Sequence, residues 1–317
     1  GYIAIAYDIG MTNGVSDTRF APTSSATREQ AAAMLVRIYE KYTAKTDNLH
    51  GFYAISSYSQ IDLTKQMDTV SLGWSRMTYH ADTGAVLNTT ASDGNVYAIP
   101  TGYADAVKQM QANGAALQLS VFMDNAGSGL TNLLASADGR AQAVSAILTE
   151  ATRVYEDLGS SPYSGVTIDF EGLAGDTNRT NFNTFLTALS AQLKAKGLSL
   201  SVCVMPATAD GSYYNGYDYR TIGQLADKVI LMAHDYQPAS LAGFVGTEYY
   251  KNAALTPIQS VYYSLRAATD PKTGVQDPAK LTLAISCAAD AWQVDANGKL
   301  LSETSTHPTM DTVAARL

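Results

Sequence analysis

The sequence predicts an α/β fold of the (β/α)8 barrel type, in which parallel strands alternate with helices. Short runs rich in β-branched residues alternate with longer amphipathic stretches, which indicates a parallel sheet. The region over which they alternate is about 270 residues long, close to the usual length of such a barrel. We therefore expect a single barrel that takes up most of the chain.

Seven runs have the character of barrel strands. They cover residues 51–55, 69–74, 117–122, 165–170, 199–204, 228–232 and 281–286. Three helical stretches between them are followed by glycine, namely 102–112, 140–158 and 181–196. Glycine commonly ends a helix because it adopts the left-handed backbone conformation without steric cost.

An eighth strand-like run is not recognisable, so we expect a barrel that lacks its last strand in this chain and leaves two edges unpaired. Truncation of a longer natural protein is the explanation that we favour. The alternative is that another segment fills the gap, and the run 2–8 is a candidate strand for it.

The first 44 residues predict a separate, short helical segment. Thr27 is a good N-cap and Gln30 completes a capping box, so an alanine-rich helix is expected from there to Tyr42. A short helix-like pattern precedes it and ends in the glycine-containing run 9–14. We therefore divide the chain into a helical segment, 1–44, and a barrel, 45–317.

The composition argues against several classes of function. Charged residues make up 16% of the chain and the net charge is −8, so nucleic acid is not an expected partner, because phosphate contacts need clustered Lys and Arg. No apolar stretch reaches the roughly 18 residues that a membrane-spanning helix needs.

A cofactor is not expected either. Cys203 and Cys287 lie in apolar runs and predict buried free thiols, and the two cysteines and four histidines show no zinc spacing. The run 127–129 is a poor nucleotide-binding fingerprint, because Asn132 stands where its third glycine would be. We expect neither a metal nor another cofactor.

The strongest chemical signal is the segment 163–171, which reads Tyr-Ser-Gly-Val-Thr-Ile-Asp-Phe-Glu. Asp169 and Glu171 stand two residues apart at the end of a predicted strand, so their side chains point the same way, together with Thr167. Such a pair suits the cleavage of sugar polymers, because one carboxyl can keep a raised pKa and donate a proton while the other stays ionised. The alternative is a strand followed by an ordinary charged loop.

This segment resembles the signature of glycoside hydrolase family 18, the chitinase-like enzymes, which is Asp-x-x-Asp-x-Asp-x-Glu on the fourth barrel strand. Asp169 and Glu171 match its last two positions, whereas Ser164 and Thr167 replace its first two acids. The resemblance implies that Glu171 is the proton donor and Asp169 its neighbouring carboxylate. It also implies a retaining, substrate-assisted mechanism on an N-acetylated polysaccharide.

Other predicted strand ends supply further candidates, since barrel enzymes keep their chemistry there. Met232 and Asp235 match the family pattern Met-x-Tyr-Asp, in which His234 replaces the tyrosine. The resemblance makes Asp235 a third acid of the site, which holds the acetamido group of the sugar. Either His234 or Tyr236 would supply the missing hydrogen-bond donor, and a structural barrel histidine is the alternative for His234.

Four further residues are candidates for contact with sugar because the family places methionine and aromatic residues at such positions. Met205 ends the fifth run and Tyr213 follows it, Trp74 ends the second run, and Trp292 follows the seventh. Core packing is the alternative for the aromatic residues.

The N-terminal segment resembles most of one surface-layer homology repeat, from about residue 2 to 42. The usual signature is Gly-x-x-x-Gly, Phe-x-Pro and Thr-Arg before a helix, and it matches residues 10–14, 20–22 and 27–28. Such repeats bind an acidic polymer of bacterial cell walls, which Arg28 would contact; the alternative is an ordinary exposed arginine. The resemblance implies an extracellular, cell-wall-associated bacterial protein.

Together these resemblances imply a glycosidase that cleaves β-1,4-linked N-acetylhexosamine glycans, either peptidoglycan or chitin-like. The alternative is a barrel with little or no activity that acts as a lectin on the wall, although such members typically lack the residue at Glu171. Because Thr167 carries no charge, we expect the pKa of Asp169 to rise less than in the family and the pH profile to be altered.

Overall fold

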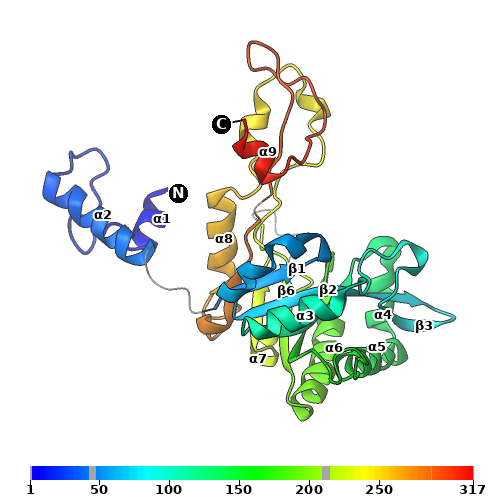
Figure 1. The fold of residues 1–317 in the computed structure, drawn as a ribbon. Helices are drawn as coiled ribbons and strands as arrows, with labels where there is room; N and C mark the ends of the chain where they lie inside the picture. Colours follow the sequence, from blue (N-terminus) through cyan, green and yellow to red (C-terminus); the bar gives the residue numbers. More distant parts are fainter. Residues whose placement is uncertain (1, 43–47, 209–214, 287, 317) are drawn as a thin grey trace. The chain divides into compact units, whose positions relative to one another are not determined.

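The computed structural model describes residues 2–42, 48–208, 215–286 and 288–316 (Figure 1). The chain divides into two compact units, Gly1–Asp47 and Asn48–Leu317. Within the described residues, no helix is long and apolar enough to cross a membrane.

The first unit contains two helices, α1 (Tyr2–Asp8) and α2 (Arg28–Tyr42). The predicted capping box is present, because the N–H of Gln30 donates to Thr27 Oγ1 at 3.2 Å and the N–H of Thr27 donates to Gln30 Oε1 at 2.9 Å. This reciprocal pair satisfies two backbone donors at the start of α2. The alternative that the run 2–8 is a strand is wrong: it forms α1, which ends before Gly10 with its φ of 71°.

The second unit is built on a curved parallel sheet, which confirms the predicted fold class. Its strands, in sheet order, are β1 (His50–Tyr53), β2 (Thr69–His80), β4 (Ala116–Met123), β5 (Gly165–Phe170), β6 (Ser199–Val204), β7 (Lys228–Leu231) and β8 (Leu281–Leu283). The strand β3 (Gly84–Asn88) pairs antiparallel with β2 outside this path. Among the described residues β1 and β8 do not pair with each other, so the sheet is an open barrel.

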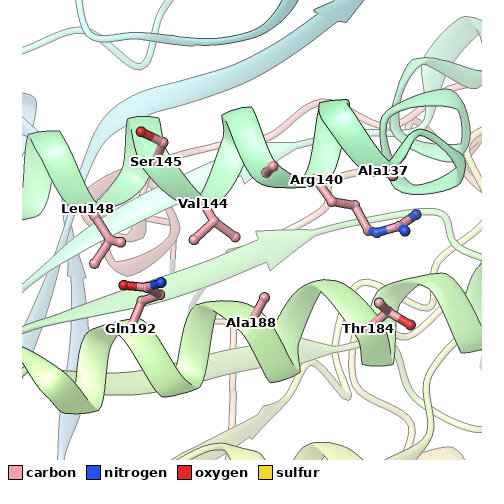
Figure 2. Close-up of a pocket in the computed structure, with 9 residues that line it drawn as sticks. Ala137, Arg140, Val144, Ser145, Leu148, Thr184, Ala188 and Gln192 are labelled. Atoms are coloured by element: carbon pink, nitrogen blue, oxygen red, sulfur yellow. The ribbon is translucent and has the colours of Figure 1, made fainter.

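Helices follow the strands along the chain. They are α3 (Tyr103–Ala112), α4 (Gly129–Ala135), α5 (Ala137–Ala151), α6 (Asp176–Ala195), α7 (Tyr219–Leu225), α8 (Ile258–Ala268) and α9 (Met310–Ala314). Short 3-10 segments cover Ile55–Gln66, Ser92–Gly94, Ala126–Ser128, Ala242–Phe244, Tyr249–Asn252 and Pro278–Lys280. Figure 2 shows α5 and α6 side by side, with a pocket between them that Val144, Leu148 and Ala188 help to line.

The apolar core lies between the outer face of the sheet and these helices. Phe170 on β5 stacks on Phe185 of α6 with ring centroids 5.4 Å apart, and Phe182 packs beside both. All three rings are fully buried. This cluster fixes the strand that carries the predicted carboxylates against the longest helix of the described chain.

The inner face of the sheet is lined by small polar side chains instead. Its buried polar residues include Ser71, Gln118, Ser120, Thr167 and Ser201. Ser71 on β2 and Thr167 on β5 have hydroxyl oxygens 2.6 Å apart although β4 lies between their strands. This contact shows how strongly the sheet curls towards its inner face.

A small C-terminal lobe is formed by residues 241–255 and 291–306, which wind together in Figure 1 (yellow and red). Backbone hydrogen bonds join them, such as Leu241 N to Glu303 O at 2.7 Å and Gly246 N to Leu300 O at 3.0 Å. The lobe has its own apolar cluster of Leu241, Ala253 and Leu300, against which Trp292 packs. Trp292 therefore has a packing role in this lobe.

Candidate active site

The two carboxylates lie where β5 ends. Val166, Ile168 and Phe170 are fully buried on the outer face of this strand, so the alternate residues Thr167 and Asp169 point inward. Glu171 extends the pairing with β4, because its N–H donates to Met123 O at 2.9 Å.

Both carboxyl groups have raised pKa values. Burial raises the pKa of Asp169 to about 7, and the negative charge of Glu171 adds to the effect. Burial also raises the pKa of Glu171, and the charges of Asp124 and Asp235 raise it further while His234 opposes them. Two neighbouring carboxyls with raised pKa values are typical of a site for proton transfer.

The raised pKa of Asp169 changes the expected division of roles. We expected Asp169 to stay ionised beside a protonated Glu171, but its burial favours the protonated form of Asp169 up to about pH 7. The two groups therefore compete for a proton, and an added hydrogen-bond donor to Asp169 would be needed to move that proton to Glu171.

The two replaced positions of the motif have different surroundings. The Thr167 hydroxyl donates to Gln118 Oε1 at 2.6 Å, and the Ser71 hydroxyl beside it lies 2.7 Å from His50 Nε2. Burial lowers the pKa of His50 to about 4, so this buried group of side chains is neutral at neutral pH. Ser164 has a structural contact, because its hydroxyl donates to Leu117 O at 3.0 Å.

The end of β7 contributes the predicted histidine and aspartate. His234 Nδ1 and Asp235 Oδ2 are 2.9 Å apart, and both charges act on Glu171. Asp235 adopts a φ of 57°, which is uncommon for a residue other than glycine and is often found at functional sites. The hydroxyl of Tyr236 lies 2.9 Å from Ser264 Oγ, so of the two candidate donors His234 is the better placed.

A connected group of side chains that the sequence analysis missed reaches the carboxylates; it consists of Arg76, Tyr97, Phe122 and Asp124. Arg76 of β2 forms an ion pair with Asp124 at 2.6 Å, and its guanidinium lies 5.4 Å from the ring centre of Phe122. Tyr97 stacks on the same ring with centroids 4.4 Å apart. Burial is the main cause of the raised pKa of Tyr97. The charges of Asp169 and Glu171 raise it further, so Tyr97 is a neighbour of both.

Comparison with known proteins decides the family. The sequence model of Glycosyl hydrolases family 18 matches residues 24–314, which is most of the chain. The protein belongs to family 18. Within the described residues no cluster of three or more His, Cys, Asp or Glu could hold a metal ion.

A curated relative and two solved structures resemble this family 18 chain. "Putative sporulation-specific glycosylase YdhD" of Bacillus subtilis (strain 168) is 36% identical over 87 residues, which cover 27% of this chain and 20% of that relative. The C-terminal domain of a putative chitinase from Desulfitobacterium hafniense DCB-2 has a TM-score of 0.64 at 19% identity, covering 86% of this chain and 76% of its own. The Bacillus cereus spore cortex-lytic enzyme SleL has a TM-score of 0.59 at 18% identity, and the match covers 87% of this chain and 59% of that chain. The two structures share the fold.

The expectation that Trp74 contacts sugar is not supported in this family 18 barrel. Its ring is only 2% exposed and packs edge-on against Tyr53 and Tyr103, with centroids 6.5 and 6.2 Å away. The reason is the alternation of side chains along β2, which places Trp74 on the same outer, apolar face as the buried Val70 and Leu72.

The other residues that were predicted to contact sugar or wall polymer lie in several parts of the chain. Met205 and Met232 are half-buried at the ends of their strands, and Met205 packs against the main core. Trp292 packs in the C-terminal lobe, and Tyr213 lies outside the described residues. Arg28 is exposed at the first residue of α2, in the other unit.

Proposed function

We propose that this protein is a retaining glycosidase of β-1,4-linked N-acetylhexosamine glycans, with Glu171 as the general acid and base. The observation that supports this most strongly is the pair of raised carboxyl pKa values at the end of β5. Membership of family 18 and the two-residue spacing of Asp169 and Glu171 agree with the proposal.

In the first step Glu171 donates its proton to the glycosidic oxygen. The acetamido carbonyl of the substrate attacks the anomeric carbon, and the bond to the leaving sugar breaks. Asp169 accepts a hydrogen bond from the acetamide N–H and stabilises the positive oxazolinium intermediate. In the second step the Glu171 carboxylate takes a proton from water, and this water opens the intermediate with overall retention.

Binding of the substrate also determines which of the two carboxyl groups, Asp169 or Glu171, carries the shared proton. A hydrogen bond from the acetamide N–H favours the ionised form of Asp169 and so lowers its pKa. The proton that Asp169 holds below about pH 7 then passes to Glu171, where the first step requires it. We infer that His234 and Asp235 hold the other side of the acetamido group.

The proposed substrate is a glycan of the bacterial envelope, with peptidoglycan favoured over chitin. The relatives whose names refer to sporulation or to the spore cortex support this choice. The protein would act outside the cell, and the N-terminal unit would bind an acidic wall polymer through Arg28. The capped helix that begins at Arg28 and leaves its side chain exposed supports this second part.

The test is hydrolysis of a fluorogenic N-acetylglucosamine oligomer by the wild type and by Glu171→Gln. We expect the substitution to lower kcat/KM by about 10²–10⁴-fold, because it removes the transferable proton, while binding of the oligomer is kept. Glu156→Gln, which changes an exposed acid, is the matched control and should retain activity. Turnover that survives in Glu171→Gln would contradict the proposal, and a wild type that binds the oligomer without turnover would favour a lectin.

A further inference from the structure

Asp169 lacks the partner that the family motif would give it. In the family an aspartate stands at the position of Thr167, but here the single O–H of Thr167 is donated to Gln118. The other oxygen near Thr167 belongs to Ser71, which is also held by His50. One carboxylate oxygen of Asp169, Oδ1, is buried with no hydrogen-bond partner among the described residues.

The neighbouring strand places a thiol beside Asp169. In the parallel pairing of β5 with β6, Thr167 faces Ser201 and Ile168 faces Val202. The next residues along the two strands are Asp169 and Cys203, whose side chains therefore lie side by side on the inner face. Cys203 is 1% exposed and free, and its thiol donates a hydrogen bond to the Asp169 carboxylate.

We propose that Cys203 is a positioning residue for Asp169, whose S–H holds the carboxylate until the acetamide N–H of the substrate takes over. This inference rests on the proposed function. A thiol suits the task because it is a weak donor, so that Asp169 can leave it for a stronger one. Burial raises the pKa of Cys203 well above its usual value, so the group stays neutral and can only donate.

The other titratable groups around Asp169 come from three elements. Glu171 follows β5, Tyr97 lies in the loop before α3, and Tyr217 precedes α7, where its hydroxyl donates to Phe170 O at 2.7 Å. Burial raises the pKa of both tyrosines, so they are neutral near pH 7. Among the described side chains, Cys203 and Glu171 are therefore the two that act on the ionisation of Asp169 in that range, besides its burial.

The experiment compares Cys203→Ser, Cys203→Ala and Cys203→Val in a Cys287→Ser background, with the pH dependence of kcat/KM as the first readout. Loss of the donor in the Ala and Val variants should raise the pKa of Asp169. Because Asp169 holds the last proton of the pair, the alkaline limb should then move to higher pH by roughly half a unit. The Ser variant keeps a donor and should keep the limb near that of the parent. Because Val fills the volume of the thiol, the Val variant distinguishes the effect of losing the hydrogen bond from the effect of losing packing.

A second readout does not need activity. The S–H stretch of Cys203 in the infrared spectrum should be that of a hydrogen-bonded thiol in the parent and should move towards the free value in Asp169→Asn. An unchanged stretch in that variant, or alkaline limbs in Cys203→Ala and Cys203→Val equal to the parent, would overturn the inference. If the protein hydrolyses nothing, the proposed function fails, while the infrared result still decides the contact.

Discussion

Asp169 occupies a position where its charged form is poorly solvated. The stability of the fold favours its neutral form, whereas the proposed activity needs its charged form. Burial raises its folded-state pKa to about 7, above the value of about 3.9 expected in an unfolded chain. The folded state therefore binds the proton more tightly, and its stability falls as the pH rises from about 4 to 7. The proposed reaction nevertheless needs the charged form.

The variant Asp169→Asn should therefore be inactive but more stable than the wild type. We expect a gain in the free energy of unfolding of about 1–4 kcal/mol at pH 8 and a clearly smaller gain at pH 5, because the Asp169 carboxyl is then almost fully protonated and uncharged. Urea unfolding at both pH values measures it. Asp82→Asn changes an exposed acid and should show no such pH dependence. An equal gain for Asp169→Asn at both pH values would contradict the account.

The carboxylates could be predicted from the sequence at this scale, whereas other site residues could not. The alternation of side chains along a strand is a local rule, so it placed Asp169 and Glu171 on the same side. The same rule places Trp74 with the buried Val70 and Leu72 on the outer face of β2, in agreement with the alternative of core packing. Tyr97 lies in a loop and reaches the site only through its stacking on Phe122.

At the scale of elements, the segment that follows β5 is held by the chain that enters α7. Gly216 packs so closely on this segment that an added Cβ would lie 2.2 Å from Leu173 O. The hydroxyl of the next residue, Tyr217, accepts a hydrogen bond from Leu173 N at 3.4 Å. This contact fixes the backbone immediately after Glu171.

The substitution Gly216→Ala should therefore disturb both stability and catalysis. The added methyl group must displace backbone, which we expect to cost about 1–3 kcal/mol of folding free energy. The shift of the segment should lower kcat by roughly tenfold or more through misplacement of Glu171. Gly243→Ala, where no atom lies within 4 Å of the added Cβ, is the control for thermal unfolding and kinetics. Wild-type kcat in Gly216→Ala would show that this segment does not position the acid.

Strands were predictable at this scale, and helix ends were less so. All seven predicted runs contain a strand because β-branched residues and turn signals mark them locally. The helix predicted over 140–158 instead covers Ala137–Ala151. Ser136 caps it earlier, accepting from Gly139 N at 3.0 Å, and the chain turns back after it so that Tyr155 is buried near Tyr163. The spacing of apolar residues continues through that turn, so the sequence pattern resembles that of a longer helix.

For the whole molecule, the two units have separate interiors. Every residue of the main apolar core belongs to the second unit, from Tyr53 onwards. The proposed wall contact at Arg28 and the proposed chemistry at Glu171 are therefore in different units, and each can be tested without the other.

The substitution Arg28→Ala should weaken binding to purified bacterial cell wall by roughly tenfold, because a charge-assisted hydrogen bond to an acidic polymer is lost. It should leave hydrolysis of a soluble oligosaccharide unchanged. Co-sedimentation with wall fragments measures the binding, and Lys272→Ala, an exposed site on the second unit, is the charge-matched control. Equal sedimentation of Arg28→Ala and the wild type would remove Arg28 from the proposed contact.

The role of Glu171 as proton donor is tested most directly by varying the leaving group. A natural N-acetylglucosamine oligomer needs the proton, whereas a dinitrophenyl glycoside of the same sugar has a leaving group that departs without one. We predict that Glu171→Gln loses at least about 10²-fold in bond cleavage on the oligomer but about tenfold or less in the first release of dinitrophenol. Equal losses on both substrates would contradict the account.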